Sequence, residues 1–186
     1  MTARVRRPAN PVGRFWRDAR GAAGVEFVLM LTLLTLPTLN VIDLGLYAYE
    51  RMQVETAAQA AVQAAWHACS SSAQLPTKNC TGVAATMLTA AQSTSLSTNV
   101  TLPTVVEGFY CSNGSGGLAL VGSTGTTTTA PTGAGTCTSV IAGSTTAPGD
   151  YIQATASAPY APLFGSLSLL PLPTTISRTA WLRLDK

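Results

Sequence analysis

The sequence has few charged side chains and few of the residues that catalysis uses. Charged residues make up 10% of its 186 residues, and His67 is its only histidine. We find no GxSxG nucleophile elbow, no HExxH zinc motif and no phosphate-binding glycine loop. A composition this poor in charge is typical of membrane or secreted proteins rather than of cytosolic enzymes. We therefore predict no catalytic residues, no metal and no cofactor.

Cysteine is absent from the first 68 residues, and four cysteines follow: Cys69, Cys80, Cys111 and Cys137. This distribution suits a domain that lies in an oxidising compartment. Three pairings are possible, and the sequence does not choose among them. We favour Cys69 with Cys80, across a short loop between helices, and Cys111 with Cys137, across a flexible insertion. A zinc site is the rival interpretation, but the close CxxC spacing of most zinc sites is missing.

The basic residues in excess all lie at the N-terminus. Six arginines precede Gly21 against one acid, Asp18, so residues 1–21 carry +5, whereas residues 22–186 hold five basic and seven acidic side chains, or −2. A basic segment before an apolar one stays cytoplasmic, so the chain beyond residue 46 should be exported. A nucleic-acid-binding arm would need a reader domain beside it, and none follows. We predict no nucleic-acid partner.

The segment from residue 22 to residue 46 is apolar, and its only ionisable side chains are Glu26 and Asp43. About 20 helical residues span the hydrocarbon core of a bilayer, so this segment is long enough to be a transmembrane helix. A secretory signal would have a shorter apolar core and a cleavage site of small residues after it, which we do not find here. Asp43 is expected at the outer edge of the membrane, as an interfacial residue.

The helical pattern continues beyond the membrane, through residues 47–69. Small apolar residues recur at intervals of four and three, and polar residues recur at intervals of four on another face. The apolar positions are Val54, Ala58, Ala61, Ala65 and Ala68, and the polar positions are Glu55, Gln59, Gln63 and His67. A helix that is unbroken from Ala22 to Cys69 would be about 70 Å long.

Residues 70–186 are expected to form an extracytoplasmic α+β domain. A short helix over Thr81–Gln92, capped by Thr81, would place Val83, Met87 and Ala90 on one face. Alternation predicts a strand that includes Val100, Leu102, Thr104 and Val106. Further short strand candidates are GFYC, LALV, CTSVI, YIQATA and ISRTAWLRL.

A Gly/Ser/Thr-rich stretch interrupts these candidates between about residues 112 and 136. Its low-complexity part, Gly122 to Thr136, should be mobile unless a partner or a cysteine pair restrains it. The expected fold is a long N-terminal helix whose exported half packs on a small antiparallel sheet.

The segments RGAAGVEFVLMLTLL and VIDLGLYAYERMQVETAAQAAVQAA together resemble the N-terminus of TadE-like proteins, which are minor pseudopilins of tight-adherence (Tad, or Flp) pilus systems. In that family a basic leader ends in glycine, and a prepilin peptidase cuts after it. A glutamate is the fifth residue of the mature chain, and an aromatic residue follows. The resemblance implies Gly21 and Ala22 as the cleavage site and Glu26 and Phe27 as the processing and assembly motif.

The resemblance also implies a function, a location and partners. The chain would be a single-pass protein of the bacterial inner membrane, with its N-terminus cytoplasmic and a pilin-like domain in the periplasm. It would take part in the assembly or initiation of a Tad pilus, in the pilus shaft, at its tip or in a membrane priming complex. Its implied partners are the prepilin peptidase, other pilins or pseudopilins, Tad assembly platform proteins and inner membrane lipid.

Two alternatives stay open for Glu26. In the first, Glu26 pairs with the freed N-terminal amine of a neighbouring subunit or of its own chain. In the second, Glu26 lies at the level of the lipid headgroups, as a residue of the first helical turn. The chain as a whole would be a processed pseudopilin, or a membrane-anchored adhesin or sensor domain that keeps its leader and joins no filament. Removal of the leader separates these two functions.

Overall fold

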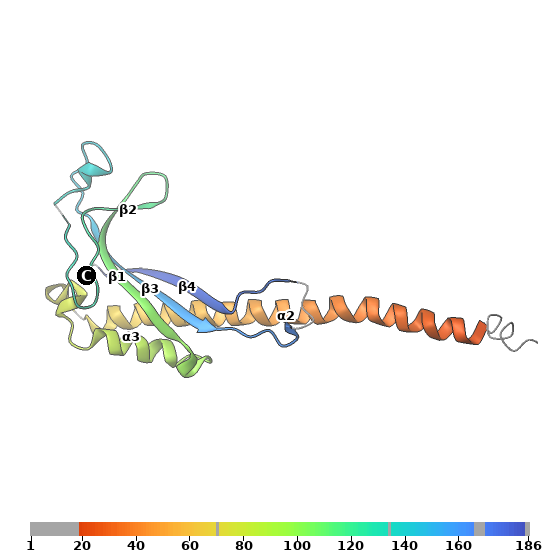
Figure 1. Ribbon diagram of the computed structural model, residues 1–186. Coiled ribbons are helices and arrows are strands. Elements are labelled where there is room, and N and C mark those ends of the chain that lie inside the picture. Colours follow the sequence, from red (N-terminus) through yellow and green to blue (C-terminus); the bar gives the residue numbers. More distant parts are fainter. Residues whose placement is uncertain (1–18, 70, 134, 166–169, 185–186) are drawn as a thin grey trace, which may run out of the picture.

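The computed structural model describes residues 19–69, 71–133, 135–165 and 170–184 (Figure 1). One long helix, α2 (Ala19–Ala68), runs the length of the structure, and a four-stranded antiparallel sheet packs on its C-terminal half. This is the predicted α+β fold. Most of the basic leader, residues 1–18, lies outside the described residues.

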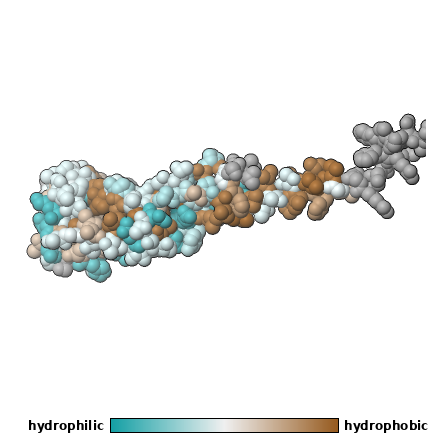
Figure 2. All heavy atoms as spheres, turned by 60° about the horizontal axis from the view of Figure 1, so that its bottom comes forward, coloured by the Kyte–Doolittle hydropathy of each residue, from teal (hydrophilic) through white to brown (hydrophobic). Residues whose placement is uncertain are grey.

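The first half of α2 extends away from the rest of the structure. The helix has 50 residues and continues through Pro37, so it is about 75 Å long at roughly 1.5 Å per residue. From Ala23 to Thr35 every side chain is exposed. Figure 2 shows this part as a largely hydrophobic rod beside a more hydrophilic globular part.

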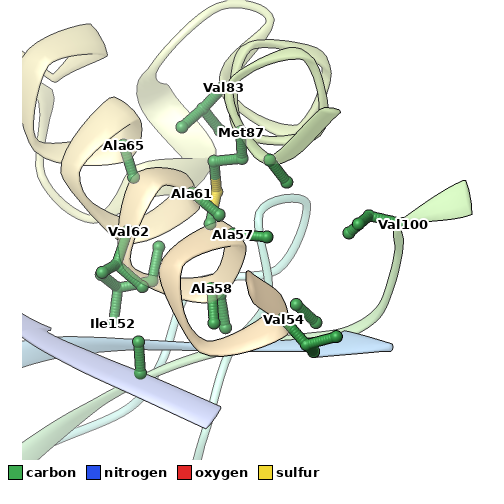
Figure 3. Close-up of a cluster of buried hydrophobic side chains, with 14 of the residues drawn as sticks. Val54, Ala57, Ala58, Ala61, Val62, Ala65, Val83, Met87, Val100 and Ile152 are labelled. Carbon is green, nitrogen blue, oxygen red and sulfur yellow. The ribbon is translucent and has the colours of Figure 1, made fainter. Parts of the chain in front are cut away.

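The second half of α2 is enclosed by helix α3 (Val83–Gln92) on one side and by the sheet on another (Figure 3). Small side chains on α2 let both neighbours approach closely, because alanine adds little volume between backbones. The polar stripe that includes Glu55 and His67 is exposed, as predicted. The buried residues of this half are Val54, Ala57, Ala58, Ala61, Val62 and Ala65.

The sheet has the strand order β2-β1-β3-β4, and every neighbouring pair is antiparallel. Its strands are β1 (Thr101–Ser112), β2 (Leu118–Leu120), β3 (Gly149–Pro159) and β4 (Thr175–Arg183). In β3, alternate residues from Ile152 to Ala158 are buried in the core that includes α2. On the outer face, hydroxyl pairs join β3 to β4: Thr155 with Thr179 and Ser157 with Ser177.

Three local predictions were wrong. Helix α3 begins at Val83 after Gly82, whose φ is +73° and whose position has no side-chain cap, so Thr81 is not the cap. The inner face of α3 ends on Ala91 rather than Ala90. CTSVI contains the short 3-10 helix η4 (Cys137–Ser139) instead of a strand. The other 3-10 helices are η1 (Ser72–Gln74), η2 (Thr77–Asn79) and η3 (Ser97–Asn99).

The low-complexity stretch folds back against β1. Gly125 and Glu107 exchange two backbone hydrogen bonds, of 2.7 and 3.1 Å, and Ser123 pairs with Thr132. A Cβ on Gly133 would lie 2.2 Å from the Phe109 ring, so the chain lies too close to β1 for any larger residue there. Sequence composition alone gave no sign of this pairing.

Candidate functional site

The exposed half of α2 is the candidate functional site. It is long and apolar enough to cross a membrane, and none of its most apolar window is buried, whereas the core helix of a soluble protein would be mostly buried. One N-terminal helix of this kind indicates a single-pass membrane anchor.

Polar side chains in this segment are satisfied by the helix itself. The hydroxyls of Thr32, Thr35 and Thr38 each donate to the carbonyl four residues earlier, over 2.7 to 2.9 Å. The Asn40 amide does the same to the Leu36 carbonyl. A polar group in lipid must find its partner inside the protein, so these residues are compatible with a bilayer.

Glu26 differs from these residues, because its carboxylate is exposed among apolar side chains and, within the described residues, has no partner. Phe27 beside it is 67% exposed. The peptide bond between Gly21 and Ala22 lies in the first turn of α2, which begins at Ala19. Ala22 and Glu26 are therefore one helical turn apart on the same face.

Asp43, which we predicted at the outer edge of the membrane, is buried by the fold rather than exposed at the surface of the helix. It is 1% exposed, and its carboxylate accepts hydrogen bonds from the backbone N–H groups of Leu163 and Phe164 at 3.0 to 3.2 Å. The hydroxyl of Tyr160 donates to the Asp43 carbonyl over 3.1 Å. Asp43 thus fastens the connection between β3 and β4 to the helix.

A signal for this role was present in the sequence. Counting back from Val54 in steps of four, three and four gives Glu50, Tyr47 and Asp43, which continues the buried stripe toward the membrane. All three side chains are buried or half-buried. The apolar character of the surrounding segment concealed this continuation.

A second buried polar group lies inside the domain. Glu107 on β1 is fully buried, and its carboxylate accepts hydrogen bonds from the Thr77 backbone N–H at 2.8 and 2.9 Å. Asp150 on β3 lies close enough to this carboxyl group to affect its pKa. Burial raises the pKa of Glu107, while the hydrogen bonds from Thr77 and the neighbouring Asp150 oppose that rise.

The four cysteines form two disulfides. Cys69 pairs with Cys80, and Cys111 pairs with Cys137. The first joins the end of α2 to the segment before α3, and its cysteines belong to the main core. The second joins β1 to η4 inside a smaller cluster with Val121.

The fold and the exposed helix define a class of protein. In this class the helix that anchors the protein in a membrane continues into an α+β domain and forms part of its core. Residues 21–63 match the family described as TadE-like protein. The resemblance seen in the sequence is confirmed for this segment. At the level of the family, the match supports a function related to Tad pili. Neither the curated proteins nor the solved structures contain a match to the chain.

Proposed function

We propose that this chain is a minor pseudopilin that takes part in the assembly or initiation of a Tad/Flp-type pilus. A prepilin peptidase would cut between Gly21 and Ala22. The mature protein would lie in the bacterial inner membrane, where it would meet other pilins or pseudopilins and the assembly platform. The proposal covers both entry into the filament and a priming complex in the membrane.

The observation that carries the proposal is the exposed carboxylate of Glu26. It is the only ionisable side chain between residues 23 and 42. The other acid of the apolar run, Asp43, is already used by the fold. A carboxylate left alone in hydrocarbon is costly, by about 2.5 to 3.5 kcal/mol at the centre of a transmembrane helix on insertion scales and by less near its ends, so a partner from outside the described chain would be favoured.

Cleavage after Gly21 would create such a partner. The new amine at Ala22 would be one helical turn from Glu26 of the same chain, and it could equally reach Glu26 of a neighbouring chain. A pair between neighbours would stabilise only the correct register of two helices, because a mismatched register leaves both charges unpaired in lipid. This selectivity suits an assembly role.

Charge and cysteine placement support the orientation. The six leader arginines favour a cytoplasmic N-terminus, so the domain with both disulfides would lie in the oxidising periplasm.

The first test is the intact mass and N-terminal sequence of the chain isolated from membranes of its native host. We expect a chain that begins at Ala22. An intact leader, in a host with an active prepilin peptidase, would contradict the proposal and favour an anchored adhesin or sensor domain.

The second test is Glu26→Ala in that host. We expect membrane insertion and cleavage to persist and pilus assembly to be lost, because the amine would have no carboxylate to pair with. Thr32→Ala is the control, since it removes an exposed polar group that is satisfied within its own helix. Sheared filaments would be quantified by immunoblotting and electron microscopy. Normal piliation in the Glu26→Ala strain would exclude the assembly role.

A further inference from the structure

The described parts of the connection between β3 and β4, residues 160–165 and 170–174, are here called the β3–β4 connection. They lie at the end of the domain nearest the exposed half of α2 (Figure 1). The connection is fixed there by Asp43, through the backbone N–H groups of Leu163 and Phe164 and the Tyr160 hydroxyl. The rings of Tyr47 and Tyr160 also meet edge to face, with centroids 5.4 Å apart. The described part of this connection is therefore held at one definite height along α2.

This connection is apolar although it is exposed. Leu163 is 67% exposed and Leu170 is 44% exposed. The chain contains no Asp, Glu, Lys, Arg or His between Asp150 and Arg178. Leucines that are exposed singly are ordinary on a protein surface, so the decisive question is whether these two continue a larger apolar surface.

The height of the connection coincides with the expected edge of the bilayer. About 20 residues of helix cross the hydrocarbon core, so a span that begins near Ala23 ends near Ile42, next to Asp43. The apolar surface continues around this level on α2 itself, with Val41, Leu44 and Leu46 exposed. In Figure 2 the hydrophobic surface extends from the rod onto the adjoining edge of the globular part.

We propose that the β3–β4 connection is a second membrane contact, which lies in the outer interface of the bilayer beside the transmembrane helix. Leu163 and Leu170 would enter the boundary between headgroups and acyl chains. Asp43 would be shielded beneath them, with its charge satisfied by backbone N–H groups instead of water. Two contacts at different points would fix the rotation and depth of the domain, which a single helix would leave free. This inference rests on α2 crossing a membrane and does not require a pilus.

Lipid is the favoured occupant because the surface is continuous with the membrane-spanning segment and lies at the same height as its end. A second copy of the chain is the competing occupant. A contact with lipid predicts quenching by brominated lipid, whereas a contact with a second copy predicts protection from acrylamide only at high protein density.

The test uses the full-length chain in phosphatidylcholine vesicles that contain brominated acyl chains. Trp16, Trp66 and Trp181 are replaced by Phe, and one Trp is placed at a chosen position. We expect Leu163→Trp and Leu170→Trp to be quenched strongly by the brominated lipid. Leu118→Trp is the matched control: Leu118 on β2 is also 44% exposed but far from the membrane side, so it should be quenched only by aqueous acrylamide.

Val28→Trp reports on the helix, since Val28 is exposed within the apolar segment. If Val28→Trp is quenched by brominated lipid while Leu163→Trp behaves like Leu118→Trp, the second contact does not exist. If Leu163→Trp is protected from acrylamide only at high protein density, the surface binds another copy and the lipid proposal is wrong. If Val28→Trp itself is not quenched, the premise that α2 spans the bilayer fails, and the proposal fails with it.

Asp43→Ala, added to the Leu163→Trp chain, tests whether Asp43 holds the β3–β4 connection at the bilayer. We expect lower quenching at residue 163, because the connection loses its fixed height, and unchanged quenching at residue 28 in the corresponding Val28→Trp chain. Unchanged quenching at residue 163 would show that Asp43 does not hold the connection at the bilayer.

Discussion

The two acids in the apolar run of α2 have opposite environments, although their surroundings in the sequence are similar. Asp43 is buried and receives backbone hydrogen bonds from a segment more than a hundred residues away. Glu26 is exposed and has no partner among the described residues. A buried carboxylate is tolerated when hydrogen bonds satisfy it, whereas an exposed one in lipid needs a partner from another molecule or from a new terminus.

Glu107 makes the stability of the domain depend on pH. Its pKa is raised in the folded state, mainly by burial, above its ordinary value near 4.5. A raised pKa means that the folded state holds the proton more tightly than the unfolded state. The stabilisation is therefore complete below pH 4.5 and is lost as the pH rises through the raised pKa.

We expect the denaturant midpoint of the full-length chain in detergent to fall as the pH rises above this range. Glu107→Gln should flatten that dependence, because the amide fills the same space and does not titrate. Glu55→Gln, at an exposed acid on α2, should leave the slope unchanged. A Glu107→Gln chain with the wild-type slope would show that another group is responsible.

At the scale of elements, the packing of α2 on the sheet depends on alanine. Ala58 on the helix and Ala154 and Ala156 on β3 are all fully buried in one cluster. Such a pattern brings backbones close together and leaves no room for longer side chains.

Ala154→Leu should therefore destabilise the fold by about 1 to 3 kcal/mol, because the added volume forces helix and sheet apart. Gln153→Leu is the control, since that residue lies on the opposite face of β3, opposite Trp181 in the register; it should change stability by no more than about 0.5 kcal/mol. Chemical denaturation of the full-length chain measures both. Equal effects of the two changes would contradict the close packing of this face.

At the scale of the whole molecule, the described chain has one main core and one smaller cluster. The main core joins α2, α3 and three strands, and the smaller cluster contains Cys111, Val121 and Cys137. Each has its own disulfide. The smaller cluster holds the Gly/Ser/Thr-rich stretch against β1.

Replacing both Cys111 and Cys137 by serine should loosen this smaller cluster and leave the main core intact. Hydrogen exchange of the full-length chain should then increase over residues 118–133 and stay slow over residues 54–65 of α2. The reason is that the lost crosslink restrained a segment with few apolar contacts of its own. If exchange increased as much over residues 54–65 as over residues 118–133, the two clusters would not unfold separately.

Features that depend on neighbouring residues could be predicted from the amino-acid sequence. The long helix, its apolar first half, the basic segment before it and the alternating strands are local patterns of charge and hydropathy, and a local pattern is fully present in the chain. The TadE-like segment was recognisable for the same reason. The Gly21, Ala22, Glu26 and Phe27 motif could be found this way, although its processing stays a prediction.

Contacts between groups that are distant in the sequence could be seen only in the tertiary structure. It shows the strand order, the cysteine pairing, the contact of Asp43 with the β3–β4 connection and the proximity of Glu107 and Asp150. Whether an acid is buried or solvated depends on the segment that packs over it, and that segment is remote in sequence. The physical chemistry of these carboxyl groups was therefore set by the fold, while the existence of the helix that carries Asp43 was set by the sequence.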